Sequence, residues 1–156
     1  MAEKINTVTR KETIMEIVRV KQVVMERPVA YTEGITSTER AGRLGIDEIG
    51  DEAQEVVLIL ILNTKNQINA IHRVFTGSLN ASVAHPREIF RSAILNNGAR
   101  NVLYHNHPSS DLTPSEADLV FTQRMMEAGE VLGIELLDHF IVSATKWLSF
   151  KEIGLL

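Results

Sequence analysis

The chain contains no cysteine, which excludes disulfide bonds and metal sites built on thiolate ligands. It also lacks an N-terminal apolar segment of the secretory type, and it has no apolar run long enough to span a bilayer. No internal repeat or low-complexity segment is present. These absences predict a protein of the reducing cytoplasm without a membrane partner.

The net charge of −4 argues against a surface built to neutralise phosphate groups. Basic and acidic residues are mixed, as in KETIMEIVRVKQ, which is typical of solvated faces. We therefore expect no nucleic-acid partner for this domain alone. A chain of 156 residues, 44% of them hydrophobic, fits one domain with a real core. We expect this domain at 14–156, after a flexible N-terminus at 1–13.

Apolar patterning predicts an α/β domain with a central mixed sheet and helices packed on its faces. The expected strands lie at 14–25 (an edge strand, with a helix as the alternative), 54–62, 67–75, 101–107, 134–142 and 147–150. The expected helices run from the capping box at 36–39 to Gly45, from His85 to the Asn97-Gly98 cap, and from Pro114 to Leu132. The buried helix positions are expected to be Ile89, Phe90, Ala93, Ile94, Val120, Phe121, Met125, Ala128 and Leu132.

Two histidines stand at the end of one predicted strand. The apolar, β-prone residues NVLY precede His105 and His107, which are separated by a single residue. Side chains at positions i and i+2 of a strand share a face, so both imidazoles should point in the same direction.

A helix start follows at a fixed distance. Thr113 is the predicted N-cap, with a proline at the first helical position and Glu116 completing a capping box. Ser115 and Asp118 then lie three residues apart on one face of the first turn, where the helix dipole favours a carboxylate. The strand end and the helix start can therefore meet at one point.

Two neutral imidazoles and a carboxylate form a common ligand set for a catalytic zinc ion, with the fourth position open to water. Such an ion lowers the pKa of its bound water from about 15.7 to about 7. A serine hydroxyl beside it can donate a hydrogen bond to the oxyanion of a tetrahedral intermediate. The spacing H-x-H-x(7)-S-x(2)-D thus predicts a metal site rather than a solvated histidine pair.

This spacing is the motif of the JAMM (MPN-plus) metalloproteases. The strings GSLNASVAHPREIF, HNHPSSDLTPSEADL and LLDHFIVS, in that order, resemble the RadC branch of that superfamily over residues 14–150. The resemblance implies the JAMM fold and a zinc-dependent metallopeptidase or isopeptidase that hydrolyses an amide bond. It also implies Zn²⁺ on His105, His107 and Asp118, Ser115 near the oxyanion, and an upstream glutamate as general acid/base.

The chain departs from the RadC pattern at two places. Ser110 stands where the family has glycine, in a loop whose backbone can require a positive φ. Leu62-Asn63 stands where the family usually has Leu-Asp. RadC proteins also commonly carry an N-terminal helix-hairpin-helix region, and we expect none in a chain of this length. The DNA role suggested by the family name therefore has no predicted carrier here.

Glu55 is the predicted general acid/base. It stands at the head of a buried strand, where an unpaired carboxylate is costly unless it serves a purpose, such as moving a proton from zinc-bound water to the leaving amine. A solvated strand-end carboxylate is the alternative, and Glu52 and Glu39 are the other candidates.

The remaining histidines have less specific contexts. His85 before a proline is expected to be an N-cap or loop residue, and His72 is expected to be exposed. Asp138 and His139 lie in an apolar strand and are candidates either for supporting the metal ligands through hydrogen bonds or for a structural role.

Two other classes of function stay open. The string His105-Asn106-His107 reads like an HNH nuclease, but nuclease HNH residues are spread over a ββα unit and are not contiguous. A non-catalytic MPN-like scaffold is the second alternative, although such a domain would be expected to lose ligands that this chain keeps. Peptide or isopeptide substrates are expected, and the sequence predicts neither their identity nor the oligomeric state.

Overall fold

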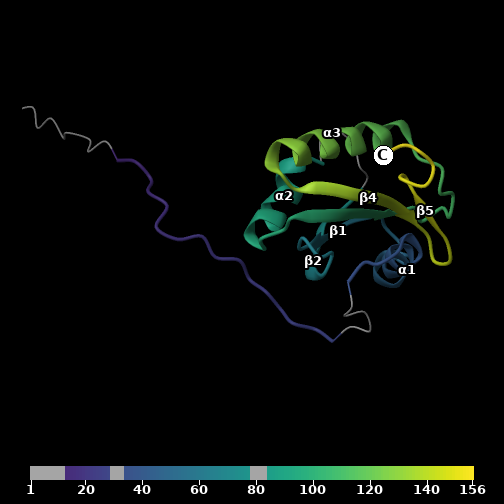
Figure 1. Ribbon diagram of the computed structural model, residues 1–156, viewed down its shortest axis with the longest axis horizontal. Helices are drawn as coiled ribbons and strands as arrows, with labels where there is room; N and C mark the ends of the chain where they lie inside the picture. Colours follow the sequence, from purple (N-terminus) through teal and green to yellow (C-terminus); the bar gives the residue numbers. More distant parts are fainter. Residues whose placement is uncertain (1–12, 29–33, 78–83) are drawn as a thin grey trace, which may run out of the picture.

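The computed structural model describes residues 13–28, 34–77 and 84–156. From Thr38 onward the chain forms an α/β domain with helices on both faces of a mixed sheet (Figure 1). The predicted fold class is confirmed. The elements are α1 (Thr38–Ile49), β1 (Val56–Leu62), β2 (Ile68–Thr76), α2 (Pro86–Leu95), β3 (Arg100–Asn106), α3 (Glu116–Leu132), β4 (Glu135–Val142) and β5 (Trp147–Ser149). The strand order is β2-β1-β3-β4-β5, with β3 and β4 parallel and the other pairs antiparallel.

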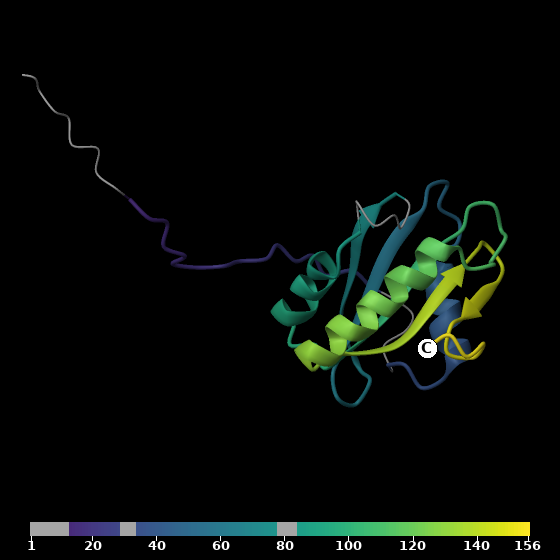
Figure 2. The ribbon, with the colours of Figure 1, turned by 90° about the horizontal axis from the view of Figure 1, so that it is seen from above.

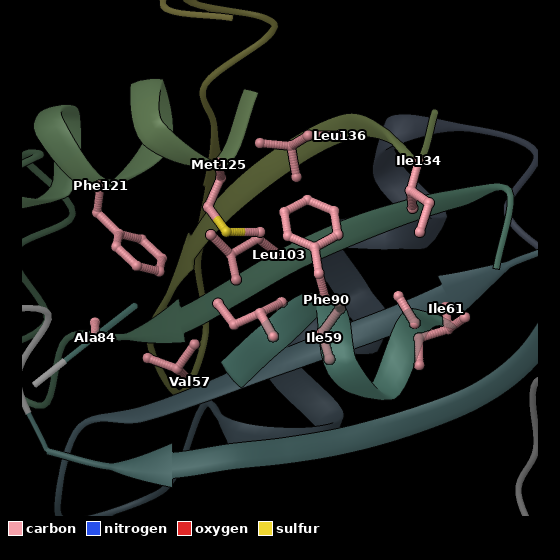
Figure 3. Packing of buried hydrophobic residues seen from close by; sticks show 12 residues of the cluster. Val57, Ile59, Ile61, Ala84, Phe90, Leu103, Phe121, Met125, Ile134 and Leu136 are labelled. Atoms are coloured by element: carbon pink, nitrogen blue, oxygen red, sulfur yellow. The ribbon is translucent and has the colours of Figure 1, made fainter. Parts of the chain in front are cut away.

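Strand β1 lies inside the sheet and is buried along its whole length, as its continuous apolar sequence predicts. Val57, Ile59 and Ile61 pack under α2 and α3 with residues such as Phe90 and Met125 (Figure 3). The alternate residues of β1 face the opposite way and pack against α1. Two apolar clusters of comparable size therefore cover both faces of the strand.

The crossover β3-α3-β4 brings a strand end and a helix start together. Parallel strands cannot be joined by a tight turn, so α3 must run back across the sheet between them (Figure 2). The loop at 107–115 connects the carboxyl end of β3 to the amino end of α3. This connection positions the two halves of the predicted metal site.

Several predicted boundaries are confirmed. His85 caps α2 through its side chain, Pro86 opens that helix, and Asn97 has the left-handed backbone (φ 52°) expected of the cap signal. Gly133 ends α3 with φ 68°. His72 is exposed on the hairpin strand β2, as expected.

The edge strand predicted at 14–25 is wrong, and so is its helical alternative. Within the described residues this segment has no regular structure and joins no ladder of the sheet. Its apolar side chains, including Ile17 and Val23, are largely exposed. The chain extends away from the domain before Gln22, which exchanges hydrogen bonds of 3.1 Å with Asn96 (Figure 1). Apolar β-branched composition does not by itself form a strand, because a strand also needs backbone pairing, and this segment pairs with neither edge strand of the sheet. The predicted flexible segment 1–13 lies almost wholly outside the described residues.

Helix α1 does not end at Gly45 but continues to Ile49. Its N-cap is Ser37, whose side chain accepts the Arg40 amide, one residue later than the predicted box at 36–39 places it. Gly45 serves packing: a Cβ there would lie 2.5 Å from the ring of buried Tyr104. The glycine lets the helix approach the sheet closely.

Three apolar residues predicted to be buried are exposed instead. Ile94 is 56% exposed, Val120 49% and Leu132 47%. Each lies at the margin of its helix's apolar stripe, whose centre, Phe90 or Met125, meets the sheet. No helix among the described residues is long and apolar enough to cross a membrane.

The close contact at Gly45 should reverse the stabilising effect that a glycine-to-alanine substitution usually has in a helix. At an open helix position Gly→Ala stabilises by about 1 kcal/mol. Gly45→Ala should instead lower the free energy of unfolding by roughly 1–3 kcal/mol, because the new methyl group overlaps the Tyr104 ring. Urea denaturation measures it, with exposed Asp47→Ala in the same helix as control. A stabilised Gly45→Ala variant would contradict the packing.

Candidate metal centre

The carboxyl end of β3 carries the two histidines side by side. His105 is 1% exposed, and His107 is partly buried. The backbone of His107 still lies beside β4, because its amide donates a hydrogen bond to the carbonyl of Val142. Their Nε2 atoms face each other at 3.0 Å. The shared face predicted from their spacing is confirmed.

The amino end of α3 supplies the carboxylate, but the helix begins later than predicted. Ser115, not Thr113, is the N-cap. The Asp118 amide donates to Ser115 Oγ (3.1 Å), and the Ser115 amide donates to Asp118 Oδ2 (2.8 Å). The predicted cap at Thr113 is therefore wrong, because Ser115 and Asp118 together satisfy the free amides of the first turn better. The Thr113 amide instead donates to Asp111 Oδ1 in the preceding loop.

The strand end and the helix start converge as predicted. Asp118 Oδ1 lies 3.1 Å from His105 Nε2, and Asp118 Oδ2 lies 3.4 Å from His107 Nε2. Ligands of a tetrahedral ion with bonds of about 2.1 Å are separated by about 3.4 Å. The separations are close to this value, so the three side chains could hold a metal ion.

The tautomer of His107 fits metal binding. Its Nδ1 lies 2.6 Å from the carbonyl oxygen of Asp111. A carbonyl only accepts, so Nδ1 carries the proton and donates it. In the neutral ring Nε2 then has a lone pair, and this atom faces Asp118.

The charges of the cluster depend on one another. The hydrogen bond to Asp118 raises the pKa of His107 against the opposing effect of burial, with further contributions from the Asp111 carbonyl and the Glu55 carboxylate. Burial by itself raises the pKa of Asp118, but hydrogen bonds from His105 and His107 outweigh it and hold that pKa far below its usual range. The carboxylate therefore stays ionised, as a ligand must.

Glu55 precedes β1 on the side of the cluster. Val57 pairs with His105 across β1 and β3. Continuing this antiparallel register by two residues places Glu55 opposite His107 on the same face, consistent with its effect on the His107 pKa. The other candidates are engaged elsewhere: Glu52 pairs with Arg73 at 2.6 Å, and Glu39 pairs with an arginine of its own helix.

The sequence was compared with protein families and with individual proteins. The model of the RadC-like JAB domain matches residues 35–155. The chain belongs to this family. It is 48% identical to a UPF0758 protein of Clostridium beijerinckii over 122 residues, which cover 78% of this chain and 53% of that protein. A UPF0758 protein of Desulforamulus reducens is 48% identical over 113 residues, covering 72% and 50% of the two chains. One from Clostridium botulinum is 54% identical over 101 residues, covering 65% and 44%. The chain thus spans about half the length of these curated relatives.

In the loop after the histidines of this RadC-like JAB domain, a serine occupies a backbone conformation that glycine adopts more easily. Ser110 has a φ of 66°, in the left-handed region that side chains rarely adopt. Its amide donates to the carbonyl of His107 (2.9 Å), which closes the turn after the ligand. The loop keeps its shape at the cost of local strain.

Asn106, between the two histidines, has a role that the spacing analysis missed. Its amide Nδ2 donates to the carbonyls of Glu52 (3.2 Å) and Gln54 (3.0 Å), and its Oδ1 accepts the Val56 amide (2.6 Å). Alternation along β3 turns it away from the cluster, so it clamps the turn that carries Glu55. Both amide hydrogens and Oδ1 are thus engaged with the backbone before β1, away from the cluster, which argues against the nuclease interpretation of His105-Asn106-His107.

Asp138 and His139 divide between the two roles considered for them. His139 Nε2 lies 2.7 Å from Nδ1 of His105, in direct contact with the cluster. Asp138 instead accepts from Ser149 Oγ (2.5 Å), the Lys151 amide (3.1 Å) and the backbone amide of His139 (2.8 Å), which ties the C-terminal turn to β4. Burial raises the pKa of Asp138 against these bonds. Thr122 contacts His139 from α3 and was not singled out by sequence reasoning.

The corrected cap can be tested with a matched pair. Ser115→Ala should lower the free energy of unfolding of the metal-free protein by about 1 kcal/mol, because it removes the N-cap. Thr113→Ala should change it by less than about 0.5 kcal/mol, since Thr113 is an exposed loop residue. Chemical denaturation measures both. A larger loss at Thr113 would restore the earlier helix start.

Metal affinity should fall with acidity in a defined direction. The pKa of His107 is raised, so its protonated form, which cannot bind a metal, becomes populated at a higher pH than for a free imidazole. Below that pKa we expect the association constant to fall about tenfold per pH unit for each proton displaced. Competition titrations with a chromogenic chelator from pH 8 to pH 5 measure this. Affinity independent of pH would exclude His107 as a ligand, and His107→Ala provides the control without the site.

Proposed function

We propose that this domain is a zinc-dependent hydrolase of the JAMM type that cleaves an amide bond, as a metallopeptidase or isopeptidase. The observation that carries the proposal is the approach of two imidazole Nε2 atoms and one ionised carboxylate to within 3.0–3.4 Å of one another. Nitrogen and oxygen donors in this number suit zinc, and three protein ligands leave its fourth position open. A bound ion would supply Lewis-acid activation of water at neutral pH.

His105, His107 and Asp118 would hold the ion. The backbone around them supports this role, because the Asp111 carbonyl orients His107 and the capping box orients Asp118. These hydrogen bonds restrict the side-chain rotamers of His107 and Asp118. The ligand set needs little rearrangement to bind.

Glu55 would move the proton. Its carboxylate would accept a proton from the attacking water and return it to the nitrogen of the leaving amine, so that the glutamate ends the cycle unchanged. Among the described residues no side chain pairs with the Glu55 carboxylate, which leaves it free to do so. The clamp by Asn106 supports this role by fixing the turn.

Ser115 would stabilise the oxyanion. Its Oγ accepts the Asp118 amide, so its own hydroxyl proton is available to a substrate. A hydrogen bond that forms to the developing negative charge contributes about 2.7–4 kcal/mol to transition-state stabilisation. Because Ser115 also caps α3, its replacement would affect both the helix and the chemistry.

The test is turnover by the zinc-loaded protein on a panel of peptide and isopeptide substrates, with and without a chelator. Glu55→Gln should keep zinc stoichiometry by elemental analysis and lower turnover by roughly 10²–10⁴, the usual contribution of a positioned general acid/base. Glu52→Gln is the matched control, since that carboxylate pairs with Arg73, and it should keep turnover within a few-fold.

Other outcomes have distinct meanings. Undiminished turnover in Glu55→Gln would remove this residue from the mechanism. Loss of zinc in the same variant would make Glu55 a fourth ligand, and the domain would then be an interaction scaffold with a closed metal site. Chelator-resistant turnover would contradict the proposal as a whole.

A further inference from the structure

A buried line of hydrogen bonds leads from His105 back to its own cluster. His105 Nδ1 lies 2.7 Å from His139 Nε2, His139 Nδ1 lies 2.6 Å from Thr122 Oγ1, and Thr122 Oγ1 lies 2.7 Å from the backbone carbonyl of Asp118. His139 is fully buried and Thr122 is 2% exposed. The line starts at one candidate ligand and ends on the backbone of another.

The last acceptor determines the direction of every proton in this line. A carbonyl only accepts, so the Thr122 hydroxyl donates to Asp118 and its oxygen accepts from His139 Nδ1–H. A neutral His139 then has a bare Nε2, which can only accept. Its partner, Nδ1 of His105, must therefore carry a proton.

A competing contact makes this constraint necessary. Asp118 Oδ1 lies 3.1 Å from His105 Nε2 and would attract a proton to that atom in the metal-free protein. A neutral ring with its proton on Nε2 could not bind a metal through that atom. Opposing this tautomer therefore requires an interaction at the other ring nitrogen of His105, Nδ1.

We propose that Thr122 and His139 are positioning residues that hold a proton on Nδ1 of His105 and so leave its Nε2 for a metal ion. Neither residue touches the ion or the substrate. The consequence for metal binding rests on the proposed function, whereas the tautomer is a property of the metal-free chain. The helix α3 thus contributes twice to the centre, with Asp118 as ligand and with Thr122 one turn later.

The first test needs no variant. Long-range ¹H–¹⁵N spectra of the metal-free protein labelled at histidine report which ring nitrogens carry protons. We expect a proton on Nδ1 of His105, and a proton on Nδ1 but not on Nε2 of His139. A proton on Nε2 of His139, or a bare Nδ1 on His105, would overturn the proposal. If the protein binds no zinc, the proposed function fails while this result still stands or falls separately.

The second test uses isosteric variants and zinc affinity. Thr122→Val keeps the volume but removes the hydroxyl, and it should weaken zinc binding about 10- to 100-fold, the usual effect of losing a residue that orients a ligand. Thr122→Ser restores the hydroxyl and should bind within about threefold of wild type. Equal affinity for all three proteins would contradict the positioning role.

A control separates positioning from general stability. Asp138→Asn alters a buried residue whose carboxylate accepts from Ser149 Oγ, the Lys151 amide and the backbone amide of His139, and has no hydrogen bond to an imidazole ring of the line. It should lower the melting temperature without changing zinc affinity. If it weakened zinc binding as much as Thr122→Val does, the loss would reflect stability rather than the hydrogen-bond line.

Discussion

The reciprocal hydrogen bonds between Ser115 and Asp118 are the interaction on which the candidate centre depends. They close the first turn of α3 and simultaneously orient the carboxylate toward His105 and His107. An aspartate in the third position of a capping box cannot rotate away without exposing a backbone amide. The stability of the helix and the geometry of the centre are therefore coupled through the same side chain.

The end of β3 distributes its polar side chains to two sides of the sheet. The imidazoles of His105 and His107 face α3, whereas the amide of Asn106 faces the turn before β1 and bonds to its backbone. A strand alternates strictly, so a polar tripeptide can serve both sides only if each side offers partners. One short segment thus holds the ligand pair and the turn that carries Glu55.

Much of the fold could be predicted because it depends on local patterns. Strand β1 is a continuous apolar run, and α2 begins at His85-Pro86, where capping chemistry is explicit. Errors arose where long-range packing overrides a local signal. Gly45 resembles a helix end but makes room for Tyr104, and residues 14–25 have strand-like composition but pair with no strand of the sheet. Thr113 failed as a cap because Ser115 had the better partner in Asp118.

By itself the sequence determined the family, the α/β class and the set of residues His105, His107, Ser115 and Asp118, because spacing along a strand and a helix dictates which side chains share a face. Only the tertiary structure determined what surrounds them. The contacts of His139 with His105 and with Thr122, and the hydrogen bond from Asn106 to the turn before Glu55, join residues between 17 and 54 positions apart along the chain. No local periodicity encodes such pairs, since they arise only when the sheet register and the α3 crossover bring separate segments into hydrogen-bonding distance.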